Sequence, residues 1–403
     1  MSSSLLYHGF GIRGYRYVST TYVEGRVLFR IEQPRESLRC SACGSDDVVL
    51  HGCQEREFTA VPIGGKPVRV ALPIPRVGCR PCGVIRQVKV PFAEARRTYT
   101  RSFERYALEL LRHTTILDVA RHLQIGWDTV KDIQKRHLQT HFGKPRLKNL
   151  RRIAIDEISV GHGHRYLTVV LNLVSGAVVF VGEGKGADAL KPFWKRLRAS
   201  RAKVHAVATD MSPAYIQAVR ENLPKATHVF DRFHVVKLFN ERFSAFRREL
   251  QRDAEGTGRK FLKGTRWLLL KNPENLDEKK GERRRLEEAL KDNAPLATVY
   301  FMKEEMRQIW EQGNKAAARL FLDDWIRRAD ASGIKVLQQF ASTLALHRTG
   351  ILNYYDCPIS TGPLEGTNNK IKTLQRQAYG FRDKEFFKLR IYALHQTKYA
   401  LVG

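Results

Sequence analysis

Two pairs of cysteines in this chain share one spacing, C-x-x-C followed by glycine. The first runs from Cys40 to Gly44 and the second from Cys79 to Gly83. Two thiolates at this spacing can occupy one side of a tetrahedral metal ion, and the glycine tolerates the left-handed turn that follows them. A redox motif would need only one pair, and isolated core cysteines would not explain the duplication. The predicted ligands of a structural zinc ion are Cys40, Cys43, Cys79 and Cys82.

Three carboxylates stand where strands and a helix are predicted to end or begin. The apolar run at 153–155 predicts a strand that ends at Asp156, another such run ends at Asp210, and Glu365 opens a C-terminal helix. Carboxylate oxygens are the ligands that Mg²⁺ or Mn²⁺ prefers. Each acid alone has an ordinary explanation as a helix cap, a turn residue or a helix N-terminal residue. Together they predict a two-metal site for phosphoryl transfer, because neighbouring strand ends and one packed helix would gather them.

Polar and basic residues follow Glu365 along one stripe of its predicted helix. At three, four, seven and eleven positions after it stand Asn368, Asn369, Lys372 and Arg376. This spacing places side chains on one face of a helix, where they could hold a phosphodiester beside the metal ions. The predicted phosphate contacts are Lys372 and Arg376, with Lys370 as a weaker candidate.

The elements that must position these acids are a run of strands and then strand–helix units. Predicted strands cover residues 153–156, 166–173, 177–181, 203–209 and 227–230, and predicted helices cover 187–199 and 213–222. The first three strands have no helices between them, which favours antiparallel pairing, whereas strand–helix units favour parallel pairing. The pattern therefore predicts an α/β fold with a mixed sheet.

The rest of the chain divides by composition and periodicity. Alternating apolar and polar residues predict β structure before residue 95, and helical spacing with many charges fills the long segment before Glu365. We expect a zinc-binding ribbon-like domain at 1–95, a helix-turn-helix domain at 96–148, a catalytic domain at 149–238 and 351–403, and an all-helical insertion at 239–350. The insertion carries Trp267, Trp310 and Trp325, for which burial in the helical core is the expectation and stacking on unpaired bases the alternative.

A pair of short helices before residue 148 is predicted to bind DNA. Thr115 and Asp118 form a capping box for the first helix, 124–126 form a turn, and the second helix covers 127–138. An ordinary αα-hairpin would show the same pattern, but the excess of Arg and Lys in this segment favours DNA binding. The predicted inner faces contain Ile116, Leu117, Val119, Ala120 and Leu123 in the first helix and Trp127, Val130 and Ile133 in the second. The predicted DNA contacts are Thr129, Lys131, Gln134, Lys135 and Arg136.

The overall charge points to a polyanionic partner. The chain has 70 Lys and Arg against 41 Asp and Glu, a net charge of +29, and nucleic acid phosphates exploit such charge through counterion release. The start of the chain does not resemble a secretory signal, and its most apolar stretch, 166–181, is too interrupted to span a bilayer. Cys53 and Cys357 stand alone, which fits a reducing cytoplasm. We expect a cytoplasmic protein that associates with nucleic acid.

Several longer motifs resemble those of one known family, the bacterial insertion-sequence transposases of the ISL3 group. The match covers nearly the whole chain. Besides the paired C-x-x-C-G, the motifs that carry it are Ile155-Asp-Glu, Thr209-Asp-Met-Ser-Pro-Ala-Tyr215, Phe230-Asp-Arg-Phe-His-Val-Val-Lys237 and Gly362-Pro-Leu-Glu-Gly-Thr-Asn-Asn-Lys-Ile-Lys372. The resemblance implies a zinc-binding segment, a helix-turn-helix and a DDE domain of RNase H-like fold.

The resemblance also implies a catalytic triad of Asp156, Asp210 and Glu365. Asp231 and His234 belong to a family motif without an assigned role, and Asp231 is the alternative to Asp210 as the second carboxylate. The implied activity is Mg²⁺- or Mn²⁺-dependent DNA strand cleavage and strand transfer at terminal inverted repeats. Two DNA ends require two active sites, so we expect a homodimer on double-stranded DNA. The alternative is a DNA-binding regulator that has lost catalysis.

Overall fold

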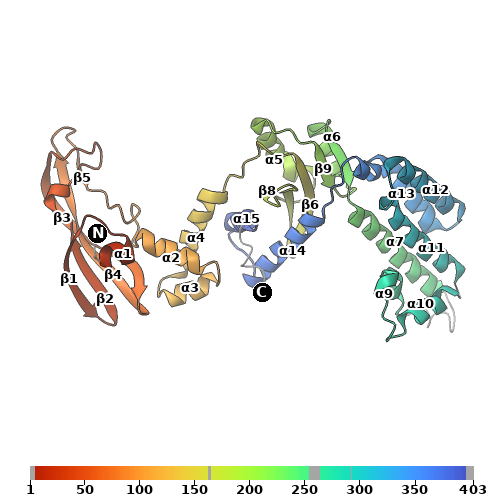
Figure 1. The fold of residues 1–403 in the computed structure, drawn as a ribbon, viewed down its shortest axis with the longest axis horizontal. Helices are drawn as coiled ribbons and strands as arrows, with labels where there is room; N and C mark the ends of the chain where they lie inside the picture. The colour runs from red at the N-terminus through yellow and green to blue at the C-terminus, as the bar shows by residue number, and fades with distance from the viewer. Residues whose placement is uncertain (1–4, 162–164, 254–263, 292, 396–403) are drawn as a thin grey trace. The chain divides into compact units, whose positions relative to one another are not determined.

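The computed structural model describes residues 5–161, 165–253, 264–291 and 293–395 (Figure 1). The chain divides into two units, with the boundary between Gly143 and Lys144. The cysteine pairs and the predicted helix-turn-helix lie in the first unit, and all three predicted catalytic carboxylates lie in the second. No helix among the described residues has the length and apolar character needed to cross a membrane.

The first unit begins with a five-stranded sheet. A short helix, α1 (Leu5–Phe10), precedes the strands β1 (Arg16–Val23), β2 (Arg26–Glu32), β3 (Val48–Ile63), β4 (Lys66–Cys79) and β5 (Ile85–Gln87). The sheet order is β1-β2-β4-β3, with β5 paired to β4. Gly64 and Gly65, both with positive φ, turn the chain between β3 and β4. Alternate residues of β4, such as Val68 and Val70, are buried, which is the pattern of a sheet with one covered face.

Three helices complete the first unit: α2 (Arg101–Leu110), α3 (Ile116–His122) and α4 (Trp127–Phe142). The predicted capping box is present, because the Thr115 hydroxyl accepts the Asp118 N–H and the Asp118 carboxylate accepts the Thr115 N–H. Val119, Val130 and Ile133 are buried between the helices as predicted. The inner faces predicted for the two helices were wrong at two positions, Leu117 and Trp127.

These two side chains are exposed, Trp127 to 43%. Leu117 comes one position after the partly buried Ile116 and lies off the stripe that contains the buried Val119 and Ala120. Trp127 is the first residue of α4, and a long side chain at a helix start covers the turn before its own Cα rather than the helix core. The apolar type of both residues misled the prediction.

The second unit contains the predicted mixed sheet. Its strands are β6 (Arg152–Gly161), β7 (Arg165–Asn172), β8 (Val178–Glu183), β9 (Ala206–Thr209) and β10 (Thr227–Phe230). The sheet order is β10-β9-β6-β7-β8. β7 pairs antiparallel with β6 and β8, whereas β9 pairs parallel with β6 and β10. This order, with these directions, is that of an RNase H-like fold and confirms the predicted α/β class.

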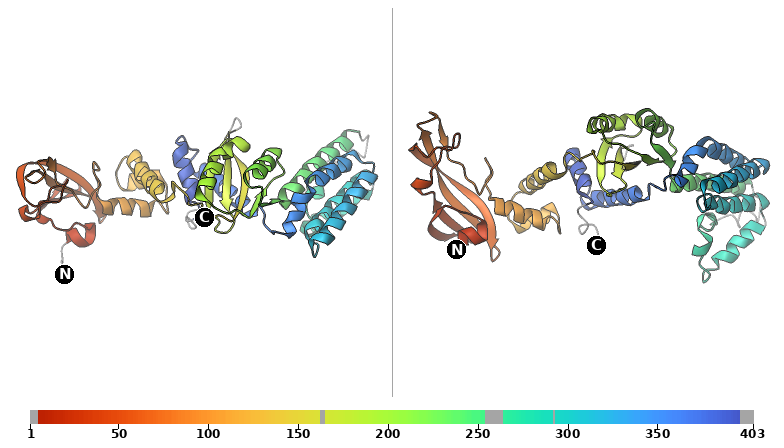
Figure 2. Two further views of the ribbon diagram at one scale, coloured as in Figure 1. Left: turned by 90° about the horizontal axis from the view of Figure 1, so that it is seen from above. Right: turned by 45° about the horizontal axis from the view of Figure 1, so that its top comes forward.

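Helices cover both faces of this sheet (Figure 2). They are α5 (Ala187–Ser200), α6 (Pro213–Asn222), α14 (Gly362–Gln377) and α15 (Lys384–Ala393). Five consecutive residues of β7, from Leu167 to Leu171, are buried, as expected for a strand that is covered on both sides. α14 packs against β6 and α15 against β8. The Tyr392 hydroxyl of α15 accepts the main-chain N–H of Val181 at 3.1 Å, which fixes the C-terminal helix on the sheet.

A helical insertion separates β10 from α14. Its helices are α7 (Arg232–Asp253), α9 (Arg266–Leu270), α10 (Glu282–Lys291), α11 (Ala294–Met306), α12 (Lys315–Ala331) and α13 (Lys335–Leu352), with 3₁₀ turns at Pro273–Asn275, Arg307–Trp310 and Asn353–Tyr355. α7 begins directly after β10 and runs through residue 239, the boundary expected for the insertion. The catalytic sheet and the insertion are therefore joined by a continuous helix.

The insertion has its own aromatic core. Trp325 is fully buried, its ring lies edge-on to Phe239 and Phe340, and its Nε1 donates to the main-chain oxygen of Met302 at 2.9 Å. Trp310 is also buried, so the expected core role holds for these two tryptophans. Trp267 differs, because 69% of it is exposed to solvent.

We predict that truncating the buried tryptophan destabilises the insertion strongly and that truncating the exposed one does not. Trp325→Ala should lower the free energy of unfolding of the insertion by about 3–5 kcal/mol, because it creates a large cavity. Trp267→Ala should change it by less than about 0.5 kcal/mol, as at other exposed positions. Urea unfolding followed by circular dichroism measures both. Equal losses in the two variants would contradict the packing described here.

Candidate functional site

The register of the mixed sheet places three aspartates at one level. β6 and β9 pair in parallel up to Ala154 and Ala208, so Asp156 and Asp210 are each two residues farther along. β9 and β10 pair up to Thr209 and Phe230, which makes Asp231 the next residue after that pair. Side chains at one level of neighbouring parallel strands point to the same side of the sheet. The fold therefore brings the two candidate second carboxylates, Asp210 and Asp231, next to each other.

Asp156 lies inside β6 and not at its end. The strand continues to Gly161, so the predicted strand end was wrong by five residues. It continues because residues beyond Asp156 keep pairing with β7, as Ser159 does with Tyr166. The Asp156 side chain is half-buried: Oδ1 accepts the Glu157 N–H at 2.8 Å, and Oδ2 accepts the side-chain amide of Asn368 at 2.8 Å.

The electrostatic surroundings of Asp156 oppose its negative charge. Burial raises the pKa of Asp156 above its ordinary value, and the nearby carboxylates of Asp210 and Glu157 raise it further. The Glu157 N–H and His234 act in the opposite direction without cancelling this effect. A cation at this position would relieve the repulsion between the two aspartates.

Asp210 is the less enclosed of the two candidate second carboxylates. It follows the last residue of β9 directly, which confirms the predicted strand end, and its side chain is half-buried. Its Oδ1 accepts the main-chain N–H of Ser212 at 3.0 Å, just before α6 begins at Pro213. Within the described residues, Oδ2 accepts no hydrogen bond from the protein, which leaves it for a ligand.

Asp231 is surrounded by donors. Its side chain is only 2% exposed. Oδ1 accepts the main-chain N–H of Thr361 at 2.9 Å, and Oδ2 accepts the N–H of Phe233 at 3.1 Å and Nδ1 of His234 at 3.3 Å. Burial by itself raises the pKa of Asp231, but the hydrogen bonds from His234 and Thr361 outweigh it and hold the pKa below its ordinary value.

His234 lies between the aspartates. Its Nε2 is 3.9 Å from Oδ1 of Asp156, on the opposite side of the ring from the Asp231 contact. Burial lowers the pKa of His234, but Asp231, Asp156 and Asp210 together hold it above its ordinary value. The imidazole therefore adds positive character to a cluster of acids.

Glu365 lies in the first turn of α14, as the sequence predicted. One turn farther on, Asn368 donates to Asp156, so this face of α14 is turned toward β6. The structure nevertheless does not gather the three carboxylates tightly. Among the described residues, the only group of three or more possible ligands whose atoms all lie within 4.8 Å is the four cysteines.

Asn368 is the site residue whose contact the sequence did not reveal. It was assigned to the phosphate-facing stripe, yet it is buried and bonded to Asp156. Its Oδ1 is buried without a hydrogen-bond partner in the structure, which is costly unless a ligand meets it. The spacing of three residues from Glu365 was the available signal. The remaining basic candidates on α14, Lys370, Lys372 and Arg376, are exposed.

Two residues of the longer motifs support the site from behind. The Glu157 carboxylate accepts the Tyr215 hydroxyl at 2.7 Å and the main-chain N–H of Gly186 at 2.9 Å. These bonds tie β6 to the start of α5 and to α6. The acid next to Asp156 therefore holds the sheet and its helices together, which explains why Glu157 and Tyr215 belong to the motifs.

The four predicted zinc ligands lie together in the first unit. The Sγ atoms of Cys40 and Cys82 are 3.6 Å apart, and those of Cys43 and Cys79 are 3.5 Å apart. Each C-x-x-C forms the same turn, in which the glycine N–H donates to the first cysteine's oxygen, and both glycines, Gly44 and Gly83, have positive φ. This is the four-thiol arrangement that closes around one tetrahedral zinc ion.

The predicted DNA-contacting residues of α4 divide into two groups. Thr129, Lys131 and Lys135 are partly exposed, and Lys131 Nζ lies 5.5 Å from the centre of the Trp127 ring. Gln134 is only 8% exposed, so most of its side chain is enclosed by the protein. Its contact with bases or phosphates stays a prediction.

Arg136 is used inside the protein. Its guanidinium bonds Glu104 at 3.0 Å, Asp132 at 3.2 Å and the Tyr99 hydroxyl at 2.7 Å. These contacts connect α4 with α2 and the segment before it. The side chain is thus positioned as a structural connection between helices.

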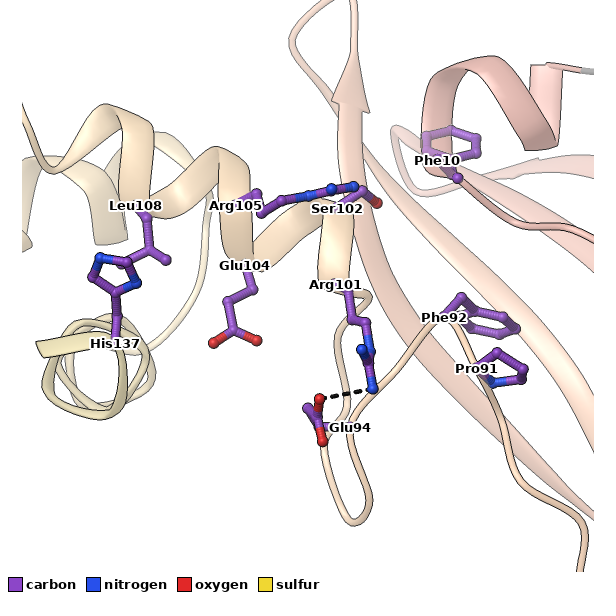
Figure 3. Close-up of a pocket in the computed structure, with 11 residues that line it drawn as sticks. Phe10, Pro91, Phe92, Glu94, Arg101, Ser102, Glu104, Arg105, Leu108 and His137 are labelled. Carbon is purple, nitrogen blue, oxygen red and sulfur yellow. Dashed lines mark ion pairs between the residues drawn. The ribbon is translucent and has the colours of Figure 1, made fainter. Parts of the chain in front are cut away.

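A cavity of about 400 Å³ lies elsewhere in the first unit (Figure 3). Phe10 and Phe92 line one side, and Arg105 and His137 of the helices line the other. Arg101 at its edge pairs with Glu94 at 2.8 Å. None of the three predicted catalytic carboxylates lines this cavity, so it is separate from the acid cluster.

Family models match three successive parts of the chain. Residues 36–82 match the zinc finger of transposases IS204, IS1001, IS1096 and IS1165. Residues 88–138 match the helix-turn-helix domain of transposase family ISL3. Residues 153–391 match the ISL3 DDE domain, described as a transposase. Their order is the order of the zinc cluster, the helix pair and the acid cluster.

Whole-chain relatives agree with these matches. The transposase for insertion sequence element IS1001 of Bordetella parapertussis is 33% identical over 392 residues, covering 95% of this chain and 96% of its own. The transposase for IS1557 of Mycobacterium tuberculosis is 32% identical, covering 89% of this chain and 86% of its own.

A solved structure, the Drosophila P element transposase strand transfer complex, overlaps with a TM-score of 0.35 and 12% identity, over 66% of this chain and 82% of that chain. The fold assignment rests on the strand order and not on this overlap. The family match over the catalytic sheet, together with relatives that span nearly the whole chain, shows that this protein belongs to the ISL3 family of DDE insertion-sequence transposases.

Proposed function

We propose that this transposase binds the terminal inverted repeats of its element and cuts and joins DNA strands through Asp156, Asp210 and Glu365. The observation that carries the proposal is the shared level of Asp156 and Asp210, combined with the Asn368 bond that turns α14 toward Asp156. Glu365 belongs to the face of α14 that makes this bond. Asp210 is preferred to Asp231 because Asp231 already receives three donors.

The donor set suits Mg²⁺ or Mn²⁺. Carboxylate oxygens are the preferred ligands of both ions, the neighbouring acids raise the pKa of Asp156 together with burial, and the orphaned Oδ1 of Asn368 adds a further neutral oxygen. When bound, a pair of such ions would activate the attacking oxygen and stabilise the leaving oxygen at phosphorus. Asp156, Asp210 and Glu365 would hold the ions, and Asn368 would keep the Asp156 carboxylate in its orientation.

The protein's task in both chemical steps is to position DNA. In the first step water attacks a phosphorus at the element end, the P–O3′ bond breaks, and a 3′-hydroxyl is released. In the second step this 3′-hydroxyl attacks a phosphorus of the target strand and displaces another 3′-oxygen. The exposed Lys372 and Arg376, with Lys370 as a weaker candidate, would contact the phosphodiester. No protein side chain becomes covalently attached.

The two modules of the first unit would supply DNA recognition. A zinc ion bound by four thiolates has no open position, so it would stabilise the ribbon without taking part in catalysis. On α4, Thr129, Lys131 and Lys135 remain the candidate contacts with bases or phosphates. Two element ends require two active sites, so we infer a homodimer on DNA, and the net charge of +29 would keep the protein on the nucleoid.

Replacing the proposed catalytic acids tests the function. Asp210→Asn and Glu365→Gln should each bind a duplex of the element end normally. Their Mg²⁺-dependent cleavage should fall by at least about a hundredfold, the scale of losing one group that stabilises transition-state charge. Gel-shift and strand-cleavage assays measure the two properties.

The matched control is Asp188→Asn, an exposed acid on α5 of the same fold, which should cut at the parent rate. Cleavage by Asp210→Asn at the parent rate would remove Asp210 from the triad. A parent chain that binds the end but cuts no strand would support the regulator alternative.

Removing one cysteine tests the zinc site. The parent should release about one equivalent of zinc on denaturation, and Cys79→Ser should release almost none and unfold its first unit at a lower temperature, because zinc binding contributes to folding. Cys53→Ser is the control, since this exposed cysteine lies outside the cluster. Retention of zinc by Cys79→Ser would contradict the assignment.

Two basic residues of α4 should respond differently to truncation. Lys131→Ala should weaken binding of the element end and reduce the slope of log affinity against log salt by about 0.9, as expected for one lost phosphate contact. Arg136→Ala should instead lower the melting temperature of the first unit, because it loses Glu104, Asp132 and Tyr99. An unchanged salt slope in Lys131→Ala would exclude Lys131 as a phosphate contact.

A further inference from the structure

The family motif that contains Asp231 and His234 has no task in the proposed chemistry. Both residues nevertheless lie beside the proposed triad, and Asp231 connects three elements. Its main-chain N–H donates to Thr209 at the end of β9 at 3.1 Å. Its carboxylate accepts the Phe233 N–H in the first turn of α7 and the Thr361 N–H just before α14. A single buried residue therefore joins the sheet through its main chain to the insertion and the last catalytic helix through its carboxylate.

The connection continues directly to Glu365. Thr361 donates its N–H to Asp231, and its carbonyl oxygen accepts the N–H groups of Leu364 and Glu365, each at 2.8 Å. Asp231 and Glu365 are thus linked through one residue, Thr361. The carboxylate fixes the point at which α14 begins, and the first turn of the helix fixes the backbone of Glu365.

This connection matters because of the insertion. The bond from Thr361 to Asp231 spans 130 residues of sequence, nearly all of them in the helical insertion. A second bond of this kind runs from the Asn353 side chain to the main-chain oxygen of His228 at 2.9 Å, but it ends eight residues before Thr361.

The same carboxylate orients His234. A hydrogen bond from Nδ1 to Asp231 directs Nε2 toward Asp156, 3.9 Å away. A carboxylate has about four lone-pair sites, and here three donors occupy them from two elements in fixed positions. Asp231 therefore has little capacity left for a metal ion.

We propose that Asp231 is a positioning residue, which fixes the start of α14, and with it Glu365, and binds no metal ion itself. The proposal rests on the triad of Asp156, Asp210 and Glu365. It assigns the two neighbouring aspartates different tasks: Asp210 faces the ion, and Asp231 holds the helix that carries the third acid.

The experiment compares Asp231→Asn with Asp210→Asn in the zinc-loaded full chain. In Asp231→Asn, the side-chain NH₂ takes the place of one carboxylate oxygen, so it faces an N–H group of the protein and at least one hydrogen bond is lost. We expect cleavage of the element end to fall by about tenfold to a hundredfold, the effect of losing a hydrogen bond to a charged group. The dissociation constant for Mn²⁺, measured by electron paramagnetic resonance, should rise less in Asp231→Asn, where one ligand is only displaced, than in Asp210→Asn, where a ligand oxygen is removed.

Hydrogen exchange supplies a readout that does not depend on activity. The N–H groups of Leu364 and Glu365 should exchange about tenfold faster or more in Asp231→Asn, because their acceptor, the Thr361 carbonyl, loses its anchor. Asn353→Ala is the matched control: it removes the other long bond from β10, and it should leave both Glu365 exchange and cleavage close to those of the parent.

A second variant keeps both aspartates. Thr361→Pro removes the main-chain N–H that Asp231 accepts, together with the Thr361 hydroxyl that lies 3.5 Å from Nδ1 of His234. The φ of Thr361, −83°, is near that of proline. It should reproduce the loss of cleavage, with a smaller loss of Mn²⁺ affinity than in Asp210→Asn. It also tests the proposal if Asp231→Asn does not fold.

Two results would overturn the proposal. Loss of Mn²⁺ affinity in Asp231→Asn as large as in Asp210→Asn would make Asp231 a ligand. Unchanged cleavage and unchanged Glu365 exchange would show that the bond to Thr361 does not position α14. Failure of the triad itself is separate, because it would appear as normal cleavage by Asp156→Asn or Glu365→Gln, variants that leave Asp231 intact.

Discussion

Repulsion between carboxylates is the constraint around which the catalytic half of this transposase is arranged. Parallel pairing of β6, β9 and β10 places Asp156, Asp210 and Asp231 at one level of three adjacent strands. Like charges this close cannot all stay ionised in a half-buried place without compensation. Hydrogen-bond donors supply this compensation, and their number differs: three reach the carboxylate of Asp231, two that of Asp156 and one that of Asp210. The least compensated acid is the one that most needs an external cation.

The bonds around the site also explain why the motifs are longer than the catalytic chemistry requires. Glu157 binds Tyr215 and the start of α5, so the acid beside Asp156 supports the sheet from its other side. Asn368 fixes one oxygen of Asp156 and thereby aligns α14 with β6. These motifs thus contain residues of the site together with residues that hold a helix or strand in place. The supporting hydrogen bonds must form before the site residues can be positioned.

Local patterns in the sequence were sufficient for the elements but not for long-range contacts. The strands of the mixed sheet, the capping box at Thr115 and the cysteine turns follow from periodicity and from short-range hydrogen bonding, and the structure confirms them. The bond from Asn368 to Asp156 spans 212 residues, and no local pattern encodes such a distance. Trp127 was misplaced because polarity alone does not say which side of a short helix packs. The tasks of Asp210 and Asp231 look identical in sequence, since both follow short buried strands.

The position of the insertion sets the order in which the ribosome produces the parts of this enzyme. The zinc ribbon, the helix pair and the sheet with its three aspartates are all translated before α7 begins at Arg232, and Glu365 is added only after the helices of the insertion. A chain that ends prematurely anywhere in the insertion would keep every DNA-recognition module and lack the third acid of the proposed triad. Under the proposed function, nonsense mutations in this stretch would produce proteins that bind element ends without cutting them, and such truncated copies would compete with the intact enzyme for its own DNA.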